Sequence, residues 1–78
     1  MAKDLKETIY ESLNAKYKGE REEARANIMI YLENPSGIGE HPDVIAAIDT
    51  QISAMANAQE KLDILQKVRT QGKRYPVE

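Results

Sequence analysis

Several residue types are missing from this chain of 78 residues, and each absence excludes a class of structure. Cysteine is absent, which excludes disulfide bonds and thiolate zinc sites, and a single histidine excludes a histidine-rich metal site. Phenylalanine and tryptophan are also absent, so any core consists of aliphatic residues, alanine, methionine and tyrosine. A core this small supplies no more than about 3–5 kcal/mol, so oligomerisation is the remaining common source of stability.

Long apolar runs and a marked charge excess are missing as well. The longest apolar run, residues 28–32, is far shorter than the ~20 residues of a membrane span. The first seven residues contain no apolar signal region, and the formal net charge of −2 indicates no class of partner. We therefore expect a cytoplasmic protein that does not bind membranes.

One short segment, residues 34–41, separates two long helical patterns, residues 5–33 and 42–71. Asp4 and Glu7 form a capping pattern at the first start, and Pro42 is a favoured first-turn residue at the second. Asn34 is expected to cap the end of the first helix. The sequence predicts an all-α fold, an antiparallel helical hairpin that assembles into a helical bundle.

The predicted hairpin occupies residues 1–78 as a single domain, with residues 72–78 as a tail. Gly19 lies inside the first helical pattern, where it costs about 1 kcal/mol relative to alanine. The apolar stripe keeps its phase across Gly19, which favours one continuous helix over a break into two.

Apolar residues recur at helical spacing in both patterns and predict the core. In the second pattern Ile48, Met55 and Leu62 repeat every seven residues, as in a coiled coil, and Gln51 interrupts the companion positions. The predicted core consists of Leu5, Ile9, Leu13, Ile28, Ile48, Ile52, Met55, Leu62 and Leu65.

Both patterns are apolar on more than one side near residues 34–41. Because a partner helix covers only one side of each helix, we expect the other sides to meet a second chain, most simply in a two-fold dimer. The alternatives are a monomer with surplus apolar surface and a third helix formed by folding at Gly19. The predicted oligomer interface consists of Ile28, Met29, Ile30, Ala47, Ile48, Ile52, Ala54 and Met55.

Charge is segregated along the chain, because residues 26–60 contain no lysine or arginine. The basic residues are interleaved with glutamate and aspartate, which is typical of a solvated face. The alternative is a phosphate-binding surface for nucleic acid, for which the candidates are Lys67, Arg69, Lys73 and Arg74.

The segment before the second helix has unusual local chemistry. Two glycines at a helix N-terminus can present N–H groups to an anion, so Gly37, Gly39 and His41 form a candidate anion-facing loop. Neither a dinucleotide fingerprint nor a P-loop is present, and Glu40 and Asp43 would repel phosphate, which favours a simple interhelical turn. We expect no cofactor, no metal site and no enzymatic activity, because no nucleophile–base pair or convergent ligand set is visible.

Residues 26–49, with the pattern NPSGIGEHPD at residues 34–43, resemble small uncharacterised helical proteins of tailed marine bacteriophages. The resemblance implies a protein made in an infected bacterial cytoplasm that acts by binding, and it transfers no catalytic residue. The predicted function is non-enzymatic self-association and partner binding through helix faces. The alternative is a nucleotide- or nucleic-acid-binding modulator of host or defence machinery.

Overall fold

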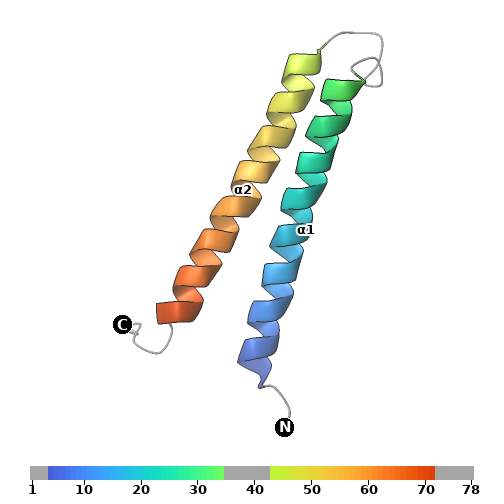
Figure 1. The fold of residues 1–78 in the computed structure, drawn as a ribbon. Coiled ribbons are helices and arrows are strands. Elements are labelled where there is room, and N and C mark those ends of the chain that lie inside the picture. The colour runs from blue at the N-terminus through green and yellow to red at the C-terminus, as the bar shows by residue number, and fades with distance from the viewer. Residues whose placement is uncertain (1–3, 35–42, 72–78) are drawn as a thin grey trace.

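The computed structural model describes residues 4–34 and 43–71, which form two long helices lying side by side (Figure 1). Helix α1 spans Leu5–Glu33 and helix α2 spans Val44–Gln71. The end of α1 and the start of α2 lie together, which we call the loop end, and the opposite end is the open end (Figure 1). The predicted all-α antiparallel hairpin is confirmed, and the described residues contain no strand.

The ends of α1 follow from local capping chemistry. The Asp4 carboxylate accepts a hydrogen bond from the backbone N–H of Glu7 at 2.8 Å, which satisfies one of the free donors at the helix start. At the other end the backbone N–H of Asn34, the capping residue, donates to the carbonyl of Ile30 at 2.8 Å. Between these caps α1 continues through Gly19 without a break, as predicted.

Helix α2 begins two residues later than predicted. Its first described bond runs from the N–H of Ala47 to the carbonyl of Asp43 at 3.0 Å, so Asp43 is the cap and Val44 is the first helical residue. The predicted start at Pro42, like most of the predicted loop and the whole tail, lies outside the described residues.

The two helices pack along a narrow seam whose centre consists of small side chains. Ala24 of α1 and Ala58 of α2 are each only 2% exposed, and Leu62 is the third buried apolar residue. Alanine at the centre lets the helices approach closely. The seam repeats every seven residues, as in coiled coils, and is continued by half-buried residues: Tyr10, Tyr17 and Tyr31 on α1, and Val44, Gln51 and Leu65 on α2.

The predicted core is confirmed in part. Leu62 is buried, and half-buried positions along the seam are occupied by Leu13, Ile28, Ile48, Met55 and Leu65. The core prediction is wrong for Leu5, Ile9 and Ile52, which are 74%, 47% and 51% exposed. On α1 the row that starts at Tyr10 is in phase with the seven-residue seam, and Ile9 lies one position beside it.

A polar pair interrupts the seam near the loop end. The side-chain amide of Asn27 donates to the side-chain carbonyl of Gln51 at 3.2 Å, and both residues are half-buried. Gln51 therefore has a partner where the sequence alone shows only an interruption. A polar pair of this kind favours the register in which both groups are hydrogen-bonded.

Candidate functional site

The hairpin leaves much of its apolar surface uncovered. Large apolar side chains that remain exposed occur on both helices and at both ends: Leu5, Ile9, Met29, Ile30, Leu32, Ile45, Ile52, Ile64 and Val68. Single exposed apolar residues are ordinary on protein surfaces, but this many on so short a chain are not. These side chains are the first candidate for a functional surface.

The structure divides the eight predicted interface residues into two groups. Ile28, Ala47, Ile48 and Met55 are half-buried beside the seam, whereas Met29, Ile30, Ile52 and Ala54 are exposed. The first group already packs within the hairpin, so the second group is the part that remains available to another chain. Their role as an oligomer interface stays a prediction.

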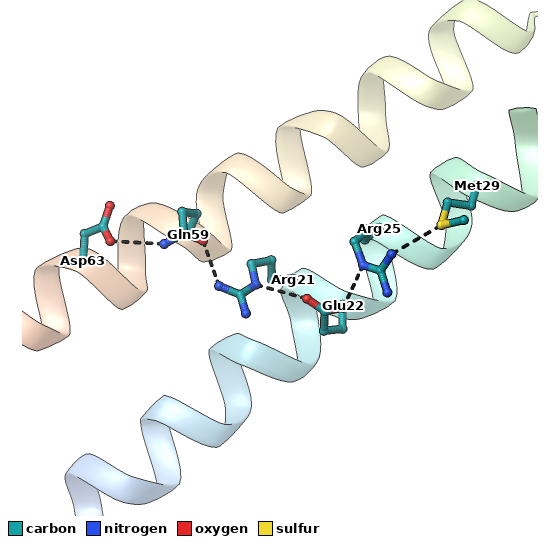
Figure 2. A network of polar contacts seen from close by, with 6 residues as sticks. All are labelled: Arg21, Glu22, Arg25, Met29, Gln59 and Asp63. Carbon is teal, nitrogen blue, oxygen red and sulfur yellow. Dashed lines mark hydrogen bonds and ion pairs between the residues drawn. The ribbon is translucent and has the colours of Figure 1, made fainter.

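One side of the seam carries a chain of polar contacts, shown in Figure 2. Arg21 of α1 donates to the side-chain carbonyl of Gln59 of α2 at 2.9 Å, and the amide of Gln59 donates to Asp63 at 3.1 Å. On α1 the carboxylate of Glu22 accepts from Arg21 at 3.3 Å and from Arg25 at 2.8 Å. We call this the arginine side, and its Arg21–Gln59 contact cross-links the two helices beside the alanine pair of the seam.

Two apolar residues extend the arginine side toward the loop end. Ile28 lies seven residues after Arg21, and Ile52 lies seven residues before Gln59. Residues seven apart share one side of a helix in a coiled-coil seam. The Arg21–Gln59 hydrogen bond therefore places Ile28 and Ile52 on the same side of the hairpin.

The opposite side of the seam is hollowed by two grooves, which together we call the grooved face. The first groove is mostly polar and is lined by Glu20, Glu23, Ala24, Asn27, Gln51, Ala54, Asn57, Ala58 and Lys61. The second is mostly apolar and is lined by Tyr17, Lys61, Ile64, Leu65 and Val68. Because Lys61 lines both, the grooves are neighbours on one face. Of the predicted site residues that the structure describes, only Ala54 lines either of these two grooves.

The basic side chains of Arg69 and Lys61, toward the open end, have partners within the chain. Arg69 pairs with Glu7 and lies over the ring of Tyr10, with 5.7 Å between the guanidinium carbon and the ring centroid. The ammonium of Lys61 lies 5.5 Å from the centroid of Tyr17. These contacts reduce the positive charge that is available to a phosphate.

The predicted basic surface is therefore described only in part. Arg69 is engaged by Glu7 and Tyr10, Lys67 is exposed, and Lys73 and Arg74 lie outside the described residues. The candidate anion-facing loop of Gly37, Gly39 and His41 lies outside them as well. Within residues 4–34 and 43–71, no three metal-ligating side chains come together.

Ion pairs along α1 shift the titration of three exposed groups. The Lys16 ammonium donates to the Glu20 carboxylate at 2.8 Å, which raises the pKa of Lys16 and lowers the pKa of Glu20. Hydrogen bonds from Arg25 and, more weakly, Arg21 lower the pKa of Glu22. Such pairs contribute little to stability because water screens them, and none has the burial expected of a catalytic acid or base.

The polar groove is the feature that the sequence analysis missed. Glu20, Glu23, Asn27 and Asn57 were not assigned to any site, although Glu23 belongs to a row with seven-residue spacing that was legible in advance: Ile9, Lys16, Glu23 and Ile30. The row is not apolar throughout, so it does not appear as an apolar stripe in the sequence.

Comparison with known proteins assigns no function to these surfaces. In the part of the chain that the structure describes, neither helix has the length and apolar character needed to cross a membrane. The resemblance of residues 26–49 to tailed-phage proteins stays a prediction. No protein-family model, no curated protein and no solved structure matches the chain.

Proposed function

We propose that this protein is a non-enzymatic interaction module that associates with a second copy of itself, and with a protein partner, through the sides of its helices. The observation that carries the proposal is the imbalance of burial. Among residues 4–34 and 43–70, the hairpin fully buries only Ala24, Ala58 and Leu62, while nine large apolar side chains stay exposed. A two-helix scaffold of this size needs a further source of stability, and association with another chain supplies it.

The pairing of the basic residues favours this proposal over nucleic-acid binding. Arg21, Arg25 and Arg69 each contact a glutamate of the same chain, so a phosphate would have to displace those carboxylates. If the protein nevertheless bound nucleic acid, its retention on immobilised DNA or RNA would fall steeply as salt is raised. Self-association through apolar surface would instead persist as salt is raised, because salt does not weaken apolar contacts. The proposed setting is the cytoplasm, that of an infected bacterium if the phage resemblance holds.

Light scattering across a dilution series tests the proposal directly. At micromolar concentration we expect a mass of at least twice the chain mass of 8.8 kDa. The circular dichroism spectrum should be that of a helical protein. A folded, monodisperse monomer at these concentrations would overturn self-association. Retention on nucleic acid that is lost with added salt would instead support the alternative.

A substitution in the seam tests whether association depends on the hairpin. Met55→Asp places a carboxylate among half-buried apolar side chains and should reduce both helicity and mass, because an unpaired charge is costly to bury. Ser53→Asp, at an exposed position two residues earlier, is the matched control and should retain both. Unchanged helicity and mass in Met55→Asp would show that the seam is wrongly assigned.

A further inference from the structure

The grooved face carries a row of residues on α1 that is complementary to the same row of a second copy running in the opposite direction. Glu23 lines the polar groove, and residues seven apart on α1 share its side, so the row consists of Ile9, Lys16, Glu23 and Ile30. In sequence order the row is apolar, basic, acidic, apolar. Its apolar ends are open to solvent, since Ile9 is 47% and Ile30 is 56% exposed.

We infer that the grooved face binds a second copy of this chain in the antiparallel orientation, with the loop end of each copy on the open end of the other. The inference rests on the proposed self-association and adds its face and direction. A two-fold axis that lies in the interface and crosses the helices stacks α1 on the α1 of the second copy, running the opposite way.

This symmetry pairs every member of the row with a complementary one. An axis midway between Lys16 and Glu23 sets Lys16 of each copy opposite Glu23 of the other. The same axis sets Ile9 opposite Ile30, because both pairs are centred on the same point. That point lies between Gly19 and Glu20, at the centre of α1, which spans Leu5–Glu33. Overlap of the two helices is therefore complete.

The charge distribution selects this orientation over the one with both loop ends together. The described residues on the loop side of this axis, 20–34 and 43–57, carry six carboxylates against two arginines, Arg21 and Arg25. Two such halves placed face to face would juxtapose two surfaces of net negative charge. The antiparallel arrangement lays each acidic half on the open half of the other copy, where the other described basic residues lie: Lys6, Lys16, Lys18, Lys61, Lys67 and Arg69.

The available area is that of a stable dimer. Each helix is about 40 Å long and about 10 Å wide, so a face of two helices offers roughly 800 Å² per copy. The standard protein interface buries about the same area on each partner. The arginine side, with Ile52, remains outside this contact and is left for a different partner.

Disulfide trapping tests the orientation, because the natural chain has no cysteine and each introduced thiol reports one position. Chains carrying Ile30→Cys are mixed with chains carrying Ile9→Cys, Thr50→Cys or Ile52→Cys, oxidised, and analysed by mass spectrometry. We expect the Ile30–Ile9 disulfide in about tenfold excess over the other two, because only that pair is held close. Ile52 is the matched control, being similarly exposed on the arginine side.

The outcomes separate this inference from the proposed function. An excess of the Ile30–Thr50 disulfide would mean that the loop ends lie together, and an excess of the Ile30–Ile52 disulfide would mean that another face is used. Either result, with a dimer mass in light scattering, overturns the antiparallel grooved-face dimer and leaves self-association standing. A monomer mass overturns both. As a second measurement, Ile30→Gln should weaken the dimer at least tenfold and Ile52→Gln should not; equal effects contradict the inference.

Discussion

Replacing Gly19 with alanine should stabilise the hairpin, and the structure allows the size of the effect to be worked out. Gly19 lies in the middle of α1 and is exposed, and a Cβ atom added there would meet nothing within 4 Å. The substitution therefore changes helix propensity without a steric cost. Alanine is favoured over glycine in a helix interior by about 0.8–1.0 kcal/mol. In a domain of this size that difference raises Tm by roughly 4–8 °C.

Thermal unfolding followed by circular dichroism measures this change. All variants are compared at one chain concentration, because association makes Tm depend on concentration. Ala15→Gly is the matched control, since Ala15 is exposed four residues earlier in the same helix and the exchange is reversed. It should lower the unfolding free energy by about 1 kcal/mol. If Ala15→Gly behaves in this way and Gly19→Ala brings no gain, Gly19 is not an ordinary helical position and the continuous α1 is refuted.

Three further predictions concern the cap, the seam and the surface ion pairs. Asp4→Ala removes the side chain that accepts from the N–H of Glu7 and should cost about 1 kcal/mol in urea unfolding; an unchanged midpoint would contradict the cap. Leu62→Ala should cost about 2–5 kcal/mol, because Leu62 is buried, whereas exposed Leu5→Ala should stay within about 0.5 kcal/mol, and equal losses would refute the seam. Because Lys16 and Arg25 lower the pKa values of Glu20 and Glu22, these carboxylates stabilise the fold above their ordinary pKa of 4.5 and lose that contribution as the pH falls through the lowered values. The Tm of the natural chain should therefore fall more between pH 7 and pH 3 than that of the double variant Glu20→Gln, Glu22→Gln, and parallel falls would show that the ion pairs do not stabilise the folded state.

The antiparallel dimer gives the mixed charge pattern of α1 a physical explanation. Lys16 and Glu23 look like ordinary surface residues when each is considered within one chain. In the inferred dimer they lie between two apolar contacts, where they favour one direction of approach over the other. Electrostatic complementarity of this kind contributes more to orientation than to affinity, so Ile9 and Ile30 are expected to supply most of the binding energy.

Local sequence determined the helices themselves. The capping residue Asp4, the stop at Asn34 and the seven-residue repeat of Ile48, Met55 and Leu62 each act within one or two helical turns. Signals of that range suffice to predict two helices, their approximate bounds and the inward side of α2. The start of α2 lies two residues later than predicted. Pro42 is compatible with a first helical turn, but the first described helical hydrogen bond is accepted by the carbonyl of Asp43, so the helix begins after that residue.

Tertiary packing alone decided which side of α1 faces α2 and which polar groups meet. Apolar residues cover about half of α1, so the pattern near its start does not decide whether Ile9 or its neighbour Tyr10 faces the second helix. The alanine pair at residues 24 and 58 brings the helices close and selects the Tyr10 row. The hydrogen bond between Arg21 and Gln59 joins residues 38 positions apart, and the grooved face exists only between the two helices. No local pattern encodes such contacts, because they depend on the register of one helix against the other.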